Sequence, residues 1–204
     1  MTLNSLSTKI AEYLAGQTGQ SKEVLTYGLE IIIGAILKGL ILTVISYLLG
    51  IFTPTITVII FAAVLRIVSG GAHCSSYRRC LISGLIVFIS LGFMNTIFYV
   101  TSNKAFNLLL TIGFLFTLVV IMLWVPGPSD NRRIIEKERR LRFKCFSLLI
   151  TIASYVVIIW AYHNNLRLIA QSGLTGLLWQ TFSVTPAGYV FLTVLDSVLN
   201  KLKI

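Results

Sequence analysis

The sequence predicts an all-α, polytopic integral membrane protein with about six membrane segments and an N-terminal amphipathic helix at the membrane interface. Hydrophobic residues make up 56 % of the chain and charged residues only 12 %, whereas about a quarter of a soluble domain is charged. The mean hydropathy is +0.87. Apolar stretches long enough to cross a bilayer recur along the chain. At 204 residues, we expect residues 1–204 to form a single membrane domain.

Residues 1–22 come first and have a helical period. Leu3, Leu6, Ile10 and Leu14 alternate with polar residues at helical spacing, which is typical of an amphipathic helix lying along the membrane surface. A short helix packed on the protein's own cytosolic face fits the same pattern.

The six expected membrane segments follow. The second is short, so it either crosses fully or forms a re-entrant segment. The sixth is interrupted at Pro186 and Gly188. Their expected ranges are 27–49, 56–68, 81–100, 105–125, 146–162 and 174–199.

The basic residues orient these segments. If residues 66–80 face the cytosol, 14 of the 17 lysines and arginines lie on that side, seven of them in the basic loop 132–144. Cytosolic loops of membrane proteins carry such an excess, so we expect both termini and residues 66–80 in the cytosol. The basic loop predicts contact with anionic lipids of the inner leaflet. Charge distributed in this way predicts no nucleic-acid partner.

Residues 66–80 form a polar segment between apolar stretches and hold the candidate chemistry. Cys80 and His73 supply the thiol and imidazole of a cysteine nucleophile site. On one helix they would lie about 10.5 Å apart along the axis, too far for the roughly 3 Å contact of a nucleophile and its base. Gly70 and Gly71 allow the backbone to bend. We therefore expect this segment not to be one continuous helix, or to tighten when substrate binds.

Other interpretations of these residues stay open. Arg78 and Arg79 favour a thiolate at Cys80, but Cys74 is a competing thiol, and a lone His and Cys are more often structural. His73 with Cys74 and Cys80 lacks a fourth zinc ligand, so we expect no metal, and no cofactor. The alternative function is a small peptide transporter or exporter, indicated by Lys38 within a membrane segment, where it could pair with Glu30 or Asp196.

The pattern R-x3-G-G-x-H-x6-C, from Arg66 to Cys80, resembles the signature of the accessory gene regulator B family of bacterial membrane endopeptidases. The stretch WVPGPSDNRRI, the late Gln180 and TPAG at 185–188 are similar too. The resemblance implies that Cys80 is the nucleophile and His73 the catalytic histidine. It implies a quorum-sensing propeptide as substrate, cleaved near its C-terminus through an acyl-enzyme that allows thiolactone or lactone ring closure.

Six further residues are expected to support this site or to bind substrate. Arg66 either holds a substrate carboxylate or anchors a helix end. Gln180 belongs to a stripe of small and polar residues, which is either a helix-packing face or a groove for the peptide, and which is compatible with a homodimer. The expected supporting residues are Arg66, Gly70, Gly71, Arg78, Arg79 and Gln180.

Overall fold

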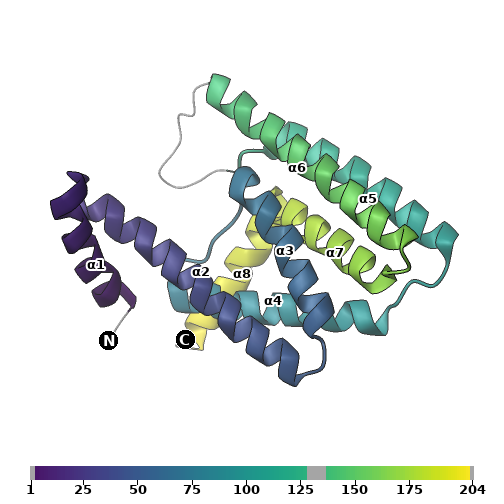
Figure 1. Cartoon of the computed structure of the whole chain (residues 1–204), viewed down its shortest axis with the longest axis horizontal. Helices are drawn as coiled ribbons and strands as arrows, with labels where there is room; N and C mark the ends of the chain where they lie inside the picture. The colour runs from purple at the N-terminus through teal and green to yellow at the C-terminus, as the bar shows by residue number, and fades with distance from the viewer. Residues whose placement is uncertain (1–2, 128–136, 203–204) are drawn as a thin grey trace. The chain divides into compact units, whose positions relative to one another are not determined.

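The computed structural model of the chain describes residues 3–127 and 137–202, and the secondary structure of this part consists of helices joined by short connections (Figure 1). Five of its helices are long and apolar enough to cross a membrane, and a bent pair could supply a sixth span. This confirms the predicted all-α, polytopic class. The helices are α1 (Leu3–Thr18), α2 (Lys22–Leu48), α3 (Phe52–Ser69), α4 (Tyr77–Ile97), α5 (Asn103–Trp124), α6 (Lys137–His163), α7 (Arg167–Val184) and α8 (Pro186–Lys201).

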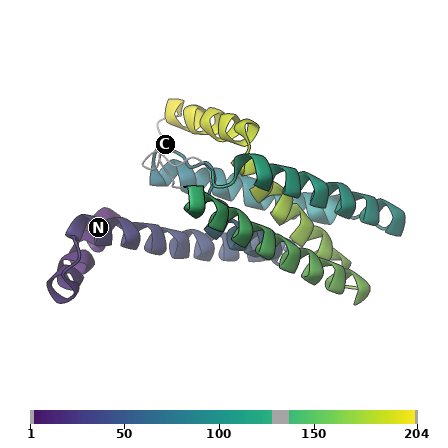
Figure 2. The ribbon, with the colours of Figure 1, turned by 90° about the horizontal axis from the view of Figure 1, so that it is seen from above.

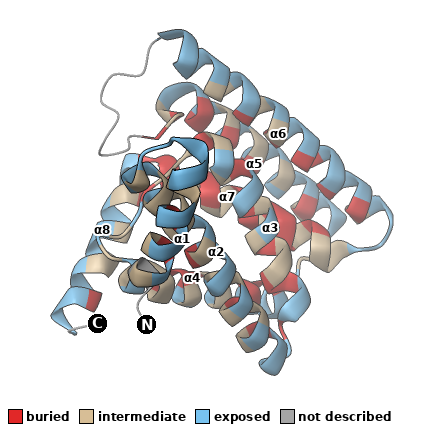
Figure 3. Cartoon of the chain, turned by 60° about the vertical axis from the view of Figure 1, so that its left-hand side comes forward, coloured by how far each residue is buried: buried red, intermediate tan, exposed pale blue. Residues whose placement is uncertain are grey.

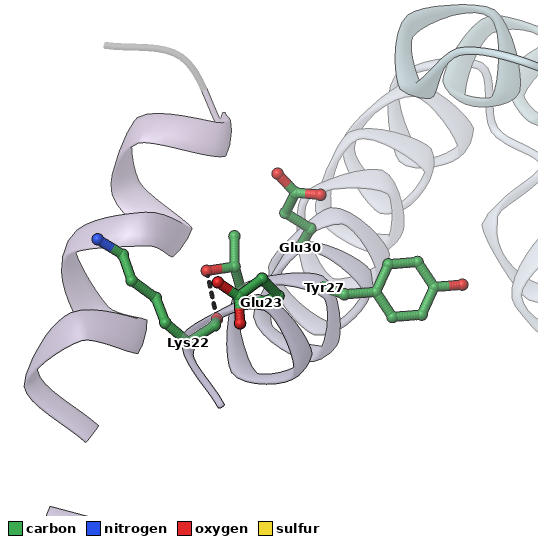
Figure 4. A pocket seen from close by; sticks show the side chains of 5 residues that line it. Lys22, Glu23, Tyr27 and Glu30 are labelled. Atoms are coloured by element: carbon green, nitrogen blue, oxygen red, sulfur yellow. Dashed lines mark hydrogen bonds between the residues drawn. The ribbon is translucent and has the colours of Figure 1, made fainter. Parts of the chain in front are cut away.

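The chain divides into two compact units, and the first, Met1–Ile45, contains α1 and most of α2. An ion pair between Lys22 Nζ and Glu12 Oε1, 2.8 Å apart, joins these helices. A shallow hollow at the start of α2 is lined by Lys22, Glu23, Thr26, Tyr27 and Glu30 (Figure 4). Its lining contains no thiol or imidazole.

The second unit, Ser46–Ile204, is built around α7, which packs against α3, α4, α5, α6 and α8 (Figure 1). Gly176 lets the backbones of α7 and α3 approach closely, because a Cβ there would lie 2.4 Å from the carbonyl oxygen of Val58. A Cβ on Gly173 would lie 3.0 Å from the Phe61 ring. Small residues play this role in membrane helix pairs, and Gly176 therefore belongs to a packing face, as one of the two interpretations of the stripe predicted.

Large apolar side chains remain exposed on the outer faces of this unit (Figure 3). On α5 they follow one stripe, with Leu108 at 61 %, Ile112 at 55 % and Leu115 at 56 % exposure. Water would disfavour a continuous apolar surface of this kind. The stripe is therefore a lipid-facing surface of a membrane protein.

The predicted sixth segment is in fact two helices. The chain bends by 87° between α7 and α8 (Figure 2), because Thr185 ends one helix and caps the next by accepting a hydrogen bond from Gly188 N at 3.1 Å. Pro186 then takes the first helical position, where its missing N–H is not needed. The expected interruption at Pro186 is correct, but α7 begins at Arg167, earlier than the hydropathy indicates.

Two further boundaries differ from the expected ones. The second segment, α3, has 18 residues and is about 27 Å long at 1.5 Å per residue, close to the thickness of a hydrocarbon core. The basic loop is largely helical from Lys137 onward, since α6 begins there, and Lys, Arg and Glu are good helix formers. Residues 132–136 of that loop lie outside the described residues.

Candidate functional site

The candidate site begins where α3 ends, and its backbone is irregular. Residues 70–76 form a non-helical linker between α3 and α4. Gly70 has a φ of 69° and Gly71 a φ of 142°, values that side chains with a Cβ rarely adopt. The expectation that residues 66–80 are not one continuous helix is therefore confirmed.

Arg66, in the last turn of α3, is the centre of a cluster of polar contacts. Its Nη2 donates to the Ala72 carbonyl at 2.6 Å and lies 3.3 Å from His73 Nε2. Its Nη1 donates to Gln180 Oε1 at 3.3 Å. We call Arg66, Ala72, His73 and Gln180 the Arg66 cluster. In it, one guanidinium joins α3, the linker and α7.

The contact between Arg66 and His73 is a hydrogen bond in only one state of the imidazole. A guanidinium has only donors, so Nε2 of His73 has to be the acceptor. That tautomer is neutral and carries its proton on Nδ1. The His73 side chain is exposed, so it can reach a substrate, and a neutral imidazole is the form that can act as a base.

Gln180 connects the core to the linker. The side chain is only 1 % exposed, and its Nε2 donates to Gly70 O at 2.7 Å and to Ser69 Oγ at 3.0 Å, while its Oε1 accepts from Arg66. Three of its hydrogen-bonding positions are thus used, and the amide orientation is fixed by its partners. Gln180 is a buried positioning residue in this arrangement and does not line an open groove.

Gly71 and Gly70 have to be glycine for different reasons. A Cβ on Gly71 would lie 3.0 Å from Ser183 Oγ, 3.1 Å from Arg66 Nη1 and 3.3 Å from Gln180 Nε2, so this glycine is packed against the cluster. Gly70 has more space, its nearest neighbour being Gly127 at 3.7 Å, and is constrained by its φ. Gly127 N also donates to Ser69 O at 2.9 Å, which brings the turn after α5 to the end of α3.

Cys80 lies in the first turn of α4 and is half-buried. Ser76 caps this helix by accepting from Arg79 N at 3.3 Å, and Cys80 N donates to Ser76 O at 2.9 Å. Arg66 lies within electrostatic range of Cys80, Tyr189 and Cys74. Both thiols of the segment are therefore in the neighbourhood of the guanidinium that contacts His73.

The arginines next to Cys80 lie in different environments. Arg79 is part of an ion pair with Asp196, with Nη1 and Oδ2 3.5 Å apart, and its Nε donates to Ser76 Oγ at 2.9 Å. Arg78 is exposed. The charge of Arg79 is therefore balanced by a carboxylate. Asp196, which the sequence offers as a partner of Lys38, contacts Arg79 and Ser75.

The second thiol of the segment has a different partner. Cys74 Sγ lies 3.2 Å from Ser83 Oγ, and Ser83 Oγ donates its single proton to Arg79 O at 2.8 Å. Cys74 is thus held against Ser83, in the first turns of α4.

Several contributors escape detection by sequence reasoning. Ser69, Ser75, Ser83 and Ser183 are common residue types with no motif of their own, and their roles depend on contacts over long sequence separations. Asp196 carries one detectable signal, an acidic residue in an apolar stretch. Among the described residues, no group of three or more His, Cys, Asp or Glu side chains could hold a metal ion.

Comparison with known proteins identifies the family. No solved structure matches the chain. An AgrB-like protein of Clostridium perfringens (strain SM101 / Type A) is 28 % identical over 214 residues, which cover 98 % of this chain and 99 % of the relative. An AgrB-like protein of Listeria innocua is 27 % identical, covering 81 % of this chain and 78 % of the relative. The family model of accessory gene regulator B matches residues 7–184. This multi-pass membrane protein therefore belongs to the accessory gene regulator B family, which acts in agr quorum sensing.

Proposed function

We propose that this chain is a membrane-embedded cysteine endopeptidase that cleaves a small amphipathic quorum-sensing propeptide near its C-terminus. The observation that carries the proposal is the non-helical linker, which holds His73 against Arg66 and leads directly into the first turn of α4, where Cys80 lies. A thiol, a neutral imidazole and a cation gathered at a glycine-rich break between two membrane helices are the groups that nucleophilic catalysis needs.

The proposed reaction proceeds in two acyl transfers. The Cys80 thiolate attacks the scissile carbonyl, the C–N bond breaks, and the leaving amine takes a proton from the His73 imidazolium, which had received it from Cys80. The product is a thioester between the peptide and Cys80. A thiol or hydroxyl of the peptide then attacks that thioester, its proton goes to His73, and Cys80 leaves as thiolate. This second step closes a thiolactone or lactone ring.

The resting geometry gives Arg66 two roles. It occupies Nε2 of His73, so the imidazole has to release Arg66 before that nitrogen can take the Cys80 proton. The freed guanidinium donor is then available for the negative charge that forms on Cys80 or on the attacked carbonyl. Gln180 and Ala72 keep the guanidinium in place during this exchange.

The charge distribution supports a cytosolic site. We infer that both termini and residues 66–80 face the cytosol, where the basic half of α6 from Lys137 to Lys144 attracts anionic lipids and an acidic part of the propeptide. Membrane-impermeant maleimide applied to intact cells should leave Cys80 unlabelled, whereas a permeant maleimide should label it. Labelling from outside would contradict this topology. A homodimer remains part of the proposal, and cross-linking in vesicles tests it.

The decisive experiment is processing of a tagged propeptide from the same bacterium, co-expressed with the chain. Cys80→Ala and His73→Gln should abolish release of the C-terminal fragment while the protein still inserts, and Cys74→Ser should retain it. Mass spectrometry of wild-type protein trapped with peptide should find the acyl group on Cys80. Processing that persists in Cys80→Ala would refute the endopeptidase.

One structural observation favours the transporter alternative besides Lys38: the 87° break between α7 and α8, since broken helices form the binding sites of many transporters. A transporter needs no thiol. Unchanged peptide export in Cys80→Ala, together with an uncleaved peptide, would favour it.

A further inference from the structure

Asp196 on α8 contacts two residues of the segment that contains His73 and Cys80, one in the linker and one in α4. Its Oδ2 accepts a hydrogen bond from Ser75 Oγ at 2.7 Å and pairs with Arg79 Nη1 at 3.5 Å. Ser75 lies two residues after His73, and Arg79 directly precedes Cys80. We call these two contacts the Asp196 bridge. A carboxylate more than 110 residues away in sequence thus links the linker to the first turn of α4.

Stability alone does not account for this carboxylate. The Asp196 and Arg79 side chains are each only 16 % exposed, and Asp196 Oδ1 is buried with no hydrogen-bond partner among the described residues. A buried ion pair with an unsatisfied oxygen contributes little net stability, because the cost of removing both charges from water offsets their attraction. Acidic residues in apolar membrane helices are typically retained for function.

The helix that carries Asp196 has a defined orientation. Val194 and Val198, 57 % and 48 % exposed, each lie two positions from Asp196, which places them about 160° away around the helix. The exposed apolar side of α8 therefore faces away from Asp196, while α8 packs on α4 and α7. Rotation of α8 about its axis would bring the valines against the site and move the carboxylate into lipid. The Asp196 bridge therefore forms in only one rotational orientation of α8.

We propose that Asp196 is a positioning residue that sets the distance between His73 and Cys80 by holding Ser75 and Arg79 together. The proposal rests on the proposed function, and it concerns a residue beyond the stretch 7–184 that the family model matches. The carboxylate restrains the linker through Ser75. It also balances the charge of Arg79, the residue next to Cys80.

The test is a double-mutant cycle read by alkylation of Cys80 with iodoacetamide. The protein carries Cys80 as its one thiol, with Cys74→Ser and Cys145→Ser, in phosphatidylcholine–phosphatidylglycerol vesicles. Asp196→Ala, Arg79→Gln and the double variant are compared across pH. Asp196→Asn separates the two contacts, since it keeps an acceptor for Ser75 and loses the ion pair. Ser197→Ala, an exposed neighbour on α8, is the matched control.

Each single variant should raise the alkylation rate at high pH about tenfold, and the double variant should raise it no further, because contacting residues couple. The alkylation midpoint should move to lower pH in Asp196→Ala, where Arg79 is unbalanced, and to higher pH in Arg79→Gln, where Asp196 is unbalanced. A general loosening of the fold would move both midpoints in the same direction.

Two results would overturn the proposal. In the first, the increase in alkylation rate of the double variant equals the product of the increases in the two single variants. In the second, the alkylation rates of the single variants lie within about twofold of that of the Ser197→Ala control. Either outcome is independent of peptide cleavage. If propeptide processing survives Cys80→Ala, the proposed function fails, yet the alkylation cycle still decides whether Asp196 positions the segment.

Discussion

Replacing Gln180 by leucine tests whether the buried amide organises the site or only joins two helices. The variant removes two bonds to neutral acceptors, Gly70 O and Ser69 Oγ, and one bond from the charged Arg66. At about 1 kcal/mol for each neutral bond and about 2 kcal/mol for the charged one, the loss is about 4 kcal/mol. Measured hydrogen bonds between membrane helices average only about 0.6 kcal/mol, which sets a lower bound of about 2 kcal/mol.

Gln171 on the same helix supplies a matched control. It accepts from Val100 N at 2.9 Å and donates to Phe98 O at 2.8 Å, nine residues before Gln180 and about 13.5 Å from it along α7. Gln171→Leu therefore loses two bonds, at a cost of about 1–2 kcal/mol by the same values. It should not disturb the Arg66 cluster.

Two assays together separate the interpretations. Unfolding in mixed micelles by titration with sodium dodecyl sulfate measures the stability of each variant, and iodoacetamide alkylation measures how strongly Cys80 reactivity depends on His73. Both variants should lose stability, but only Gln180→Leu should abolish the effect of His73→Gln on alkylation. If Gln180→Leu leaves that effect intact, the reasoning that places Gln180 in the organisation of the site is wrong.

Three other predictions follow from single contacts. Gly71→Ala should lose about 1–3 kcal/mol in the same unfolding titration, because its φ of 142° is strained for alanine, whereas Gly28→Ala, in α2 with open space around it, should be neutral or stabilising; equal losses would contradict this. The Arg66→Lys variant should insert normally but process the propeptide about a hundredfold more slowly, because one ammonium cannot reproduce the planar, forked donor geometry of a guanidinium. Near-normal processing rates would show that this geometry is not needed. The hydrogen bond and charge of Lys22 hold the pKa of Glu12 below its usual range. The Lys22–Glu12 ion pair is therefore fully formed above the ordinary glutamate pKa and is lost as the pH falls through the lowered pKa of Glu12. An NMR titration of the Glu12 carboxyl that gives an ordinary pKa would refute this.

The fold class could be predicted because it depends on composition and on one-dimensional periodicity. Segment lengths, the break at Pro186 and the non-helical linker at Gly70 and Gly71 all follow from local chemistry. The 87° bend and the early start of α7 do not, because hydropathy reports how apolar a stretch is and not how a capped break orients the next helix.

The candidate site, like the fold, can be predicted from the sequence only in part. His73 and Cys80 carry recognisable chemistry, so their residue types alone point to them. Arg66 was considered as a substrate contact or a helix anchor, and its contacts with Ala72 and Gln180 are visible only once α7 lies beside α3. Asp196 lies on α8, and nothing local in the sequence relates it to Arg79.

The position of Arg66 explains why these parts depend on one another. A guanidinium at the end of an apolar helix is costly unless its donors are used, and here it donates to Ala72 and Gln180 and contacts His73. Each partner comes from the linker or from α7, so the helix packing that satisfies Arg66 also brings the linker into place. Loss of any one partner leaves a half-buried cation with an unused donor beside Cys80. The energetic requirement of one buried charge thus couples the fold of α3 and α7 to the geometry on which the proposed chemistry depends.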